Sequence, residues 1–289
     1  MVVAALPRKP THPRPLPDQG GEKKDEIMAD TFAIITGAST GIGFELATLA
    51  AKDGYDILVV ADEPLIEAAA TDFEQFGTQV QWVEADLSTI EGVDQLLAAT
   101  GGRQIDLLCA NAGRGLGHAF LDQDLADWRR VVDTNIVGTA YLLQKVLKPM
   151  VARDAGKVLV TGSIAGFIPG AFQAVYNGTK AFVDSFTDAL RNEIKESKGV
   201  TLTTLMPGPV ETEFFERGGM MDTSVGTSDS KSDPADVAKD GWDALMAGKA
   251  SIVSGWKNKL QVAAAHVTPA SVLAEQHRKM AEPGTAPDA

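Results

Sequence analysis

The chain has 289 residues, of which 44% are hydrophobic, and a formal net charge of −13. This length and apolar content predict one substantial core, with nothing that demands a second globular domain. The acidic balance argues against nucleic acid or an anionic membrane as the main partner, because such surfaces attract basic proteins. No apolar stretch approaches the ~20 residues of a membrane-spanning helix.

The cysteine and histidine content bears on disulfide bonds and metal sites. The single cysteine, Cys109, excludes an intramolecular disulfide. The four histidines have no cysteine or histidine partners at ligand spacing, so we expect no protein metal site. Residues 1–30 hold five of the fourteen prolines and mixed charges without a secretory apolar region, so we expect a disordered tail and a cytoplasmic location.

The first predicted element is a strand, loop and helix. The apolar run Phe32–Ile35 precedes the glycine-rich segment 36–43 (Thr-Gly-Ala-Ser-Thr-Gly-Ile-Gly), and the helical pattern 44–50 follows. Glycines permit a tight turn and a close backbone approach, and the helix N-terminus favours negative charge. The segment therefore predicts a pyrophosphate-binding loop, although glycines are also ordinary turn formers.

Strand and helix patterns then alternate to the end of the predicted domain, which we place at 31–256. Alternation of this kind favours a doubly wound parallel sheet of about seven strands with helices on both faces, the three-layer Rossmann fold. A capping box at 88–91 opens one helix, and Asp233 followed by Pro234 opens another. Further strands are expected at 56–61, 79–84, 105–110, 157–161, 201–206 and 250–254, and further helices at 64–76, 125–151, 174–195 and 234–246.

The helix predicted at 174–195 carries the most informative pair of side chains. Tyr176 and Lys180 lie one turn apart, with Cβ atoms roughly 5–6 Å from each other. An ammonium beside a phenol favours the phenolate, and a serine hydroxyl such as that of Ser163 can hold a substrate oxygen. Taken alone, such a pair is more often a surface contact between helix neighbours.

Seven sequence landmarks follow one another between about residue 31 and residue 253. They are the glycine loop, Asp86-Leu87, Asn111-Ala-Gly113, Asn135, Ser163, Tyr176 with Lys180, and the segment 207–212 (Pro-Gly-Pro-Val-Glu-Thr). In this order and spacing they make the chain resemble the short-chain dehydrogenase/reductase family. The resemblance implies a single Rossmann-fold domain that interconverts an alcohol and a carbonyl with a nicotinamide cofactor.

The resemblance also implies the catalytic roles and the cofactor contacts. Tyr176 is expected to be the general acid/base, Lys180 to lower its pKa, Ser163 to fix the substrate oxygen, and Asn135 to hold a water of a proton relay. Residues expected to contact the dinucleotide are Gly37, Ser39, Thr40, Gly41, Ile42, Gly43, Asp62, Asp86, Leu87, Asn111, Ala112, Gly113, Tyr176, Lys180, Pro207, Gly208, Val210 and Thr212.

Charge at the end of the second predicted strand favours NAD over NADP. Asp62 and Glu63 occupy the place beside the adenosine ribose, where a carboxylate accepts hydrogen bonds from hydroxyls and repels a 2′-phosphate. Thr40 stands where relatives that prefer NADP often carry a basic residue, so no cation is expected nearby. Alternatively, Asp62 merely caps the helix expected at Pro64.

The substrate is less well specified. The walls are expected at 114–118, 164–172 and a mobile lid at 211–229, whose aromatic and methionine side chains favour a lipophilic substrate or simply pack on the core. An extension from 257 to 289 lies beyond the common family pattern. We expect it to form helices at 260–266 and 270–280 and to be frayed after 281. The resemblance further implies a homodimer or homotetramer paired through the fourth and fifth helices.

Three alternatives to an NAD-dependent dehydrogenase remain open at this point. One is an NADP-dependent carbonyl reductase, and another is a catalytically idle dinucleotide-binding sensor or scaffold. A third is an epimerase or dehydratase that recycles NAD internally. The full set of Asn135, Ser163, Tyr176 and Lys180 argues against the idle protein, because an inert relative would be free to lose one of them.

Overall fold

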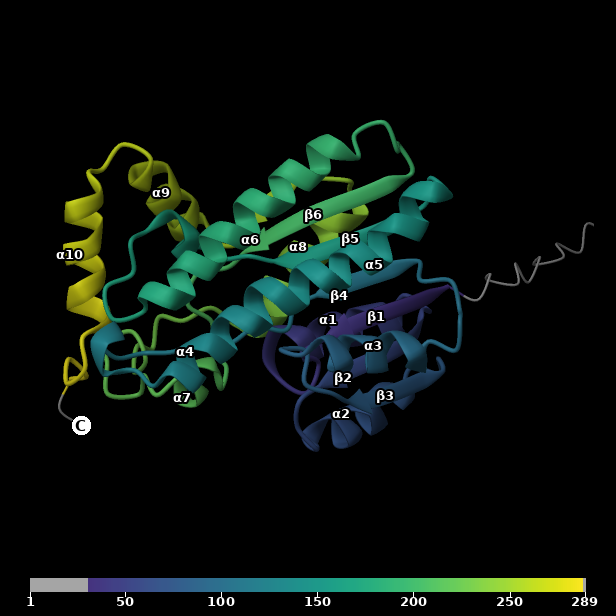
Figure 1. The fold of residues 1–289 in the computed structure, drawn as a ribbon, viewed down its shortest axis with the longest axis horizontal. Coiled ribbons are helices and arrows are strands. Elements are labelled where there is room, and N and C mark those ends of the chain that lie inside the picture. The colour runs from purple at the N-terminus through teal and green to yellow at the C-terminus, as the bar shows by residue number, and fades with distance from the viewer. Residues whose placement is uncertain (1–30, 288–289) are drawn as a thin grey trace, which may run out of the picture.

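A computed structural model describes residues 31–287, and the expected disordered tail at 1–30 lies outside that range (Figure 1). Seven parallel strands form one sheet in the order β3-β2-β1-β4-β5-β6-β7, which confirms the predicted fold class. The strands are β1 (Phe32–Thr36), β2 (Asp56–Ala61), β3 (Val80–Glu84), β4 (Leu107–Ala110), β5 (Gly156–Thr161), β6 (Val200–Met206) and β7 (Ser251–Val253).

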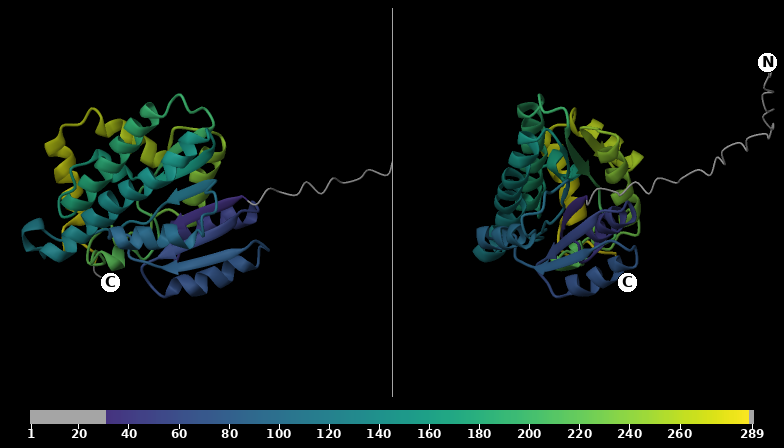
Figure 2. Two further views of the ribbon diagram at one scale, coloured as in Figure 1. Left: turned by 45° about the vertical axis from the view of Figure 1, so that its right-hand side comes forward. Right: turned by 90° about the vertical axis from the view of Figure 1, so that its right-hand side faces the viewer.

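Alternate residues of the central strands enter opposite hydrophobic layers, as a sheet covered on both faces requires. In β1, Ile35 joins the layer under α1 (Gly41–Lys52), α2 (Leu65–Glu74) and α8 (Pro234–Met246). Ile34 joins the layer under α3 (Ile90–Ala99), α5 (Thr139–Ala152) and α6 (Ala174–Glu193). The end-on view in Figure 2 shows the two helical layers on either side of the sheet. The nearly continuous apolar strands of the sequence follow from this double burial.

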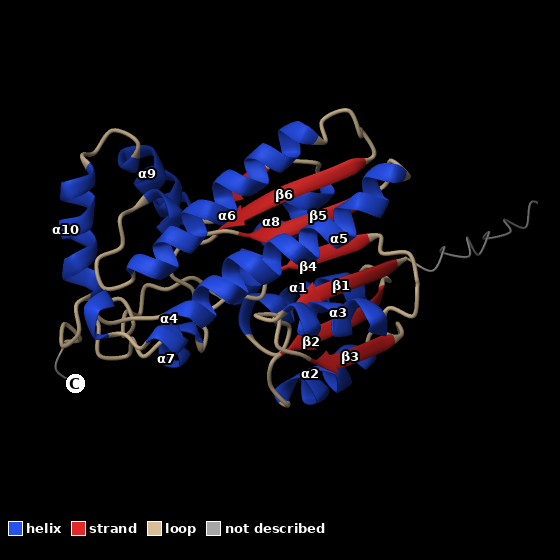
Figure 3. Ribbon diagram, in the orientation of Figure 1, coloured by secondary structure: helices blue, strands red, loops and turns tan. Residues whose placement is uncertain are grey.

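Helices cover both faces, and most of their bounds fall within a few residues of the predicted ones (Figure 3). Asp233 caps α8 by accepting a hydrogen bond from the Ala235 N–H at 2.7 Å, with Pro234 in the first turn, as predicted. The helices are α1 (Gly41–Lys52), α2 (Leu65–Glu74), α3 (Ile90–Ala99), α4 (Leu125–Val132), α5 (Thr139–Ala152), α6 (Ala174–Glu193), α7 (Phe214–Arg217), α8 (Pro234–Met246), α9 (Trp256–Ala265) and α10 (Ala270–Ala281).

Two helical details differ from the expectations. The capping box predicted at 88–91 does not form, because Thr89 rather than Ser88 caps α3 by accepting from the Gly92 N–H at 2.9 Å. The Ser88 N–H donates to the Asp86 carboxylate instead. The single helix expected at 125–151 is interrupted by a π-helical segment, Asp133–Gly138, between α4 and α5. The wider backbone there brings Gly138 against the Leu87 carbonyl, where a Cβ would come within 1.9 Å of the oxygen.

The strand order reverses between β1 and β4, and this reversal positions the site. In open α/β sheets, ligands bind in the crevice where neighbouring strands lead to opposite sides. Asn111, after β4, fastens three strand ends there, since its amide donates to the Thr36 carbonyl at 3.2 Å and accepts from the Thr161 hydroxyl at 3.0 Å. The crevice therefore has a rigid floor.

The C-terminal extension folds back over the carboxyl ends of the strands as α9 and α10, the yellow helices of Figure 1. Residues 282–287 are not frayed as expected, because the N–H groups of Gly284 and Ala286 both donate to the Asp222 carbonyl at 3.0 Å. No helix within residues 31–287 combines the length and low charge needed to cross a bilayer.

Candidate active site

A cavity of about 280 Å³ lies at the carboxyl ends of the strands and gathers nearly all the predicted site residues. Two predicted residues do not line it, because Gly43 packs behind the glycine loop and Asn135 lies behind Arg114. Those that line it are Gly37, Ser39, Thr40, Gly41, Ile42, Asp62, Asp86, Leu87, Asn111, Ala112, Gly113, Ser163, Tyr176, Lys180, Pro207, Gly208, Val210 and Thr212.

The glycine loop leaves room for a pyrophosphate where α1 begins. Gly37 and Gly41 have φ angles of 65° and 59°, which side chains disfavour. A Cβ on Gly43 would lie 1.9 Å from the Gly37 carbonyl oxygen, so only glycine allows α1 to approach this closely. Thr40 precedes the helix without capping it through its side chain, which leaves the N–H groups of the first turn facing the cavity. These residues fit a dinucleotide.

Tyr176 and Lys180 project from α6 into the same cavity, as the helical spacing predicts. The Lys180 Nζ lies 5.9 Å from the centre of the Tyr176 ring and donates to the Thr161 carbonyl at 2.8 Å. The Phe214 ring covers the Tyr176 ring, with 5.0 Å between ring centres. Ser163 follows β5, and its hydroxyl accepts from the Ala165 N–H at 3.1 Å.

The electrostatics of this pair differ from the sequence-based expectation. Burial raises the pKa of Tyr176 to about 12, with the nearby Ser163 hydroxyl opposing the shift. Burial also lowers the pKa of Lys180 to about 8, while the charge of Asp184 opposes that shift. Desolvation is therefore the main cause of both pKa shifts. A lowering of the Tyr176 pKa by Lys180 during catalysis stays a prediction.

Asp184 is a third titratable group on the same face of α6, one turn beyond Lys180. Both of its carboxylate oxygens are shielded from solvent and have no hydrogen-bond partner in the described chain. Gly162 and Gly166 pack directly against it, since a Cβ on either would come within 1.8 and 2.5 Å of a carboxylate oxygen. Burial raises the pKa of Asp184 to about 7, while the charge of Lys180 opposes the shift.

Asn135 lies in the π-helical segment and contacts the loop beside Tyr176 and Lys180. Its side-chain oxygen accepts from the Arg114 N–H at 2.8 Å, and its Nδ2 donates to the Arg114 carbonyl and the Thr179 hydroxyl, both at 2.9 Å. A Cβ on Gly113 would lie 3.4 Å from the Asn135 oxygen and 3.5 Å from the Lys180 Nζ. Asn135 therefore fixes the strand-end loop beside Lys180.

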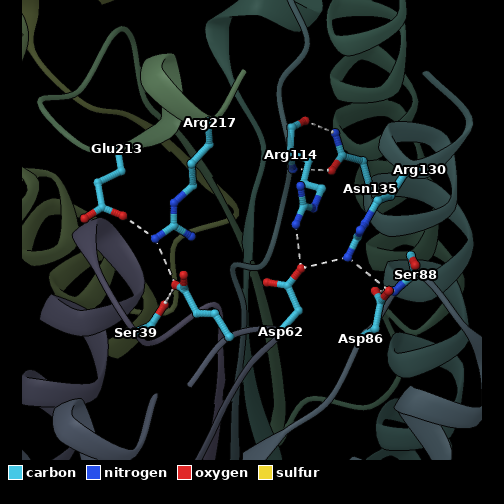
Figure 4. Close-up of polar contacts among 10 residues, drawn as sticks. Ser39, Asp62, Asp86, Ser88, Arg114, Arg130, Asn135, Glu213 and Arg217 are labelled. Carbon is cyan, nitrogen blue, oxygen red and sulfur yellow. Dashed lines mark hydrogen bonds and ion pairs between the residues drawn. The ribbon is translucent and has the colours of Figure 1, made fainter. Parts of the chain in front are cut away.

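The end of β2 carries an ion-pair network that the sequence argument missed. Asp62 accepts from Arg114 at 2.6 Å and from Arg130 at 3.1 Å, and Arg130 also reaches Asp86 at 3.1 Å (Figure 4). The expectation that no cation stands near Asp62 is therefore wrong. The alternative role of Asp62 as a cap is also wrong, because no side chain caps α2, which begins at Leu65.

A second cluster of charges lies on the other side of the glycine loop. The Ser39 hydroxyl donates to Glu63 at 2.5 Å, and Arg217 of α7 pairs with Glu63 at 2.9 Å and also with Glu213 (Figure 4). Both clusters join segments far apart in the sequence, and most of their side chains are partly exposed. Exposed ion pairs contribute only about 0–1 kcal/mol each to stability. A bound ligand can therefore replace one partner of such a pair with little loss of stability.

The substrate end of the cavity is closed by the lid and by the C-terminal extension. Phe215 and Met220 of the predicted lid are buried, as the core-packing alternative expects, whereas Met221 is exposed. The mobility of the lid and the lipophilic substrate stay predictions. Sequence reasoning missed the other residues that complete this end, because spacing does not show which side chains of the C-terminal helices turn towards the cavity. These residues are Gln173, directly before α6, Gln261 of α9, and His277, Met280 and Ala281 of α10.

Comparison with known proteins identifies the family. The model for the short chain dehydrogenase family matches residues 31–220. An uncharacterised oxidoreductase of Staphylococcus epidermidis is 32% identical over 193 residues, which cover 65% of this chain and 82% of that protein. One from Staphylococcus aureus strain MW2 is 30% identical over 219 residues, covering 74% and 90%. The chain therefore belongs to the short-chain dehydrogenase family and is an oxidoreductase.

Solved structures share the fold. A short-chain dehydrogenase from Sphingobium yanoikuyae in complex with NADPH aligns with a TM-score of 0.73 at 24% identity, covering 82% of this chain and 94% of that one. One from Burkholderia phymatum in complex with NAD gives a TM-score of 0.73 at 23% identity, covering 82% and 93%. Both fall within the Rossmann architecture seen here.

Proposed function

We propose that the protein moves a hydride between a nicotinamide dinucleotide, preferably NAD, and a lipophilic secondary alcohol or its carbonyl counterpart. The observation that carries this proposal is that Ser163, Tyr176 and Lys180 line the same cavity as the glycine loop. The walls around them are mainly apolar, with Ile164, Ile168, Phe214 and Val225 among the lining residues.

The protein's own residues supply the proton chemistry, while the bound cofactor supplies or accepts the hydride. In oxidation, Tyr176 takes the proton of the substrate hydroxyl, and in reduction it returns one to the nascent alkoxide. The Ser163 hydroxyl donates to the substrate oxygen and stabilises its developing charge. The ammonium of Lys180 stabilises the phenolate that Tyr176 forms during oxidation.

The experiment that tests this proposal replaces Tyr176 with Phe and measures turnover and dinucleotide binding. We expect turnover to fall by about 10²-fold or more, the usual scale for losing a general acid/base, with binding nearly intact. Tyr141→Phe is the matched control, because the Tyr141 hydroxyl bonds to Asp94 on the surface at 2.8 Å. Unchanged turnover in Tyr176→Phe would remove Tyr176 from the catalytic role.

The preference for NAD rests on the carboxylates of Asp62 and Glu63 at the adenosine end. Arg114 and Arg130 favour a second candidate, an NADP-dependent reductase, because a 2′-phosphate can replace Asp62 as their partner. We propose that NAD binds about tenfold more tightly, a difference of ~1.4 kcal/mol. Titration of the protein with NADH and NADPH by nicotinamide fluorescence distinguishes the two, and equal affinities would contradict the preference.

We also propose that the enzyme is a homo-oligomer that pairs through α5 and α6. Phe182 is 40% exposed on α6 and stacks on Phe186 with 5.3 Å between ring centres, whereas Leu142 and Leu143 of α5 are buried against the sheet. An exposed aromatic pair favours burial in a partner. Light scattering on the purified protein measures the state, and a monomer at micromolar concentration would contradict this proposal.

A further inference from the structure

His277 is a buried polar residue at the mainly apolar substrate end of the cavity. It belongs to α10, beyond the segment that matches the family, and is only 8% exposed. Its Nδ1 lies 2.8 Å from the carbonyl oxygen of Ala171. Because a carbonyl oxygen only accepts, Nδ1 carries the proton in this hydrogen bond.

The other ring nitrogen is therefore available to a ligand. Burial lowers the pKa of His277, which favours the neutral ring, and with Nδ1 protonated the Nε2 is an acceptor. No hydrogen bond within residues 31–287 involves Nε2, although Nδ1 is bonded and the residue lines the cavity.

The position of the ring is fixed from both sides of the cavity. Arg278 lies over the Phe172 ring at 4.9 Å from its centre, which ties α10 to the loop after Ser163. The Val225 N–H donates to the Met280 carbonyl at 3.0 Å, which ties α10 to the lid. Gln173 uses its own amide nitrogen to donate to the Met220 sulfur at 2.8 Å. The imidazole is thus a preorganised acceptor.

We propose that His277 determines substrate specificity by accepting, at Nε2, a hydrogen bond from a hydroxyl group of the substrate remote from the reacting carbon. The substrate class is then a lipophilic ketone or secondary alcohol that carries a second hydroxyl. A substrate without that hydroxyl displaces water from Nε2 and leaves the buried acceptor unpaired, which disfavours its binding. This inference rests on the proposed function of the same cavity.

The test compares pairs of alicyclic ketones that differ only by a hydroxyl far from the carbonyl. Wild-type protein should prefer the hydroxylated member about three- to tenfold in kcat/KM, the scale of one neutral hydrogen bond. In His277→Asn, the side-chain amide can still donate to the Ala171 carbonyl but has no atom at the place of Nε2. The preference should fall to about one, with activity on the plain ketone retained.

His266→Asn is the matched control, since the His266 ring packs edge-on against Phe167, 5.5 Å between centres, and does not line the cavity. If His277→Asn does not fold, His277→Phe is measured instead, because its ring fills the same space without an acceptor at the place of Nε2, and the preference should again fall to about one. An unchanged preference in His277→Asn, or none in the wild type, would overturn the inference.

Binding of the same ketone pairs, measured by thermal shift with dinucleotide present, separates this inference from the proposed function. If no ketone is turned over by the wild type, the proposed hydride transfer fails. The His277 inference still stands in that case if the hydroxylated members bind more tightly to wild type and not to His277→Asn. It fails if both members bind equally.

Discussion

The two ends of the cavity are built in different ways. Most of the nucleotide end comes from one stretch of chain, residues 32–113, in which strand ends and glycines place backbone groups around the ligand. The substrate end is assembled from three segments, 164–173, 211–229 and 256–287, held together by hydrogen bonds and ring contacts across long sequence distances.

The comparison shows that residue spacing along the chain specifies the functional positions of the nucleotide end, whereas only the tertiary fold specifies those of the substrate end. At the nucleotide end, each functional position follows from being the last residue of a parallel strand or the first of a helix. At the substrate end, His277 and Met280 acquire their roles only because α10 docks on the lid. Substitutions at the two ends should therefore have different consequences, and the following experiments test this contrast.

The largest effect is expected from Gly43→Ala at the nucleotide end. The new Cβ would lie 1.9 Å from the Gly37 carbonyl oxygen and 2.6 Å from the Asn111 amide nitrogen, and the rigid backbone cannot yield cheaply. Overpacking of this kind costs about 1–3 kcal/mol, so we expect dinucleotide affinity to fall by up to about 100-fold. Isothermal titration with NADH measures it, and near-normal affinity would show that the loop is more adaptable than its contacts imply.

Asp184→Asn is expected to move the pH dependence of oxidation. Burial lowers the pKa of Lys180 to about 8, and the Asp184 charge opposes that shift. Without this charge the Lys180 pKa falls further, so the ammonium is lost at a lower pH. The alkaline limb of kcat/KM should move down by about one pH unit. Asp188→Asn is the exposed control, and an unmoved limb in Asp184→Asn would exclude coupling to catalysis.

The sequence predicted the sheet, the glycine loop and the convergence of Ser163, Tyr176 and Lys180, because each depends on strand ends or helical spacing. Asp184 follows Lys180 by the same helical spacing, so its place beside Lys180 could also have been predicted. The position of Arg114 could not, since its ion pair with Asp62 joins residues 52 apart in the chain. Side-chain pairing between distant elements leaves no periodic signal.

Neither the π-helical segment nor the burial of Tyr176 and Lys180 could be predicted from residue spacing. Apolar residues recur throughout 125–151, so their spacing does not mark the π-helical segment Asp133–Gly138. The spacing of Tyr176 and Lys180 gives their proximity but not their burial, and burial dominates both pKa shifts. Desolvation depends on what the lid and the sheet place around the pair, which is a property of the tertiary structure.

A smaller effect is expected from removing the cations beside Asp62. Arg130→Gln deletes the bridge to Asp62 and Asp86, both at 3.1 Å, which leaves less positive charge for a 2′-phosphate. Because the pairs are partly exposed, we expect NADPH to bind up to about fivefold more weakly, with NADH nearly unaffected. Arg129→Gln, on the same helix and paired with Asp133, is the control. Equal losses for both cofactors would argue for a structural role instead.

The smallest effect is expected from Gly178→Ala. It is the same change as Gly43→Ala, but at a position where the new Cβ meets no other atoms. Gly178 lies inside α6, two residues after Tyr176, yet nothing stands within 4 Å of the place its Cβ would take. An unobstructed glycine in a helix is about 0.5–1 kcal/mol less favourable than alanine, so the variant should unfold about 1–4 °C higher with unchanged turnover. Thermal unfolding by circular dichroism measures the shift. A loss of turnover would mean that this face of α6 contacts a ligand or a partner subunit in the working enzyme. The need for glycine at this position would then come from that contact and not from the fold of the chain itself.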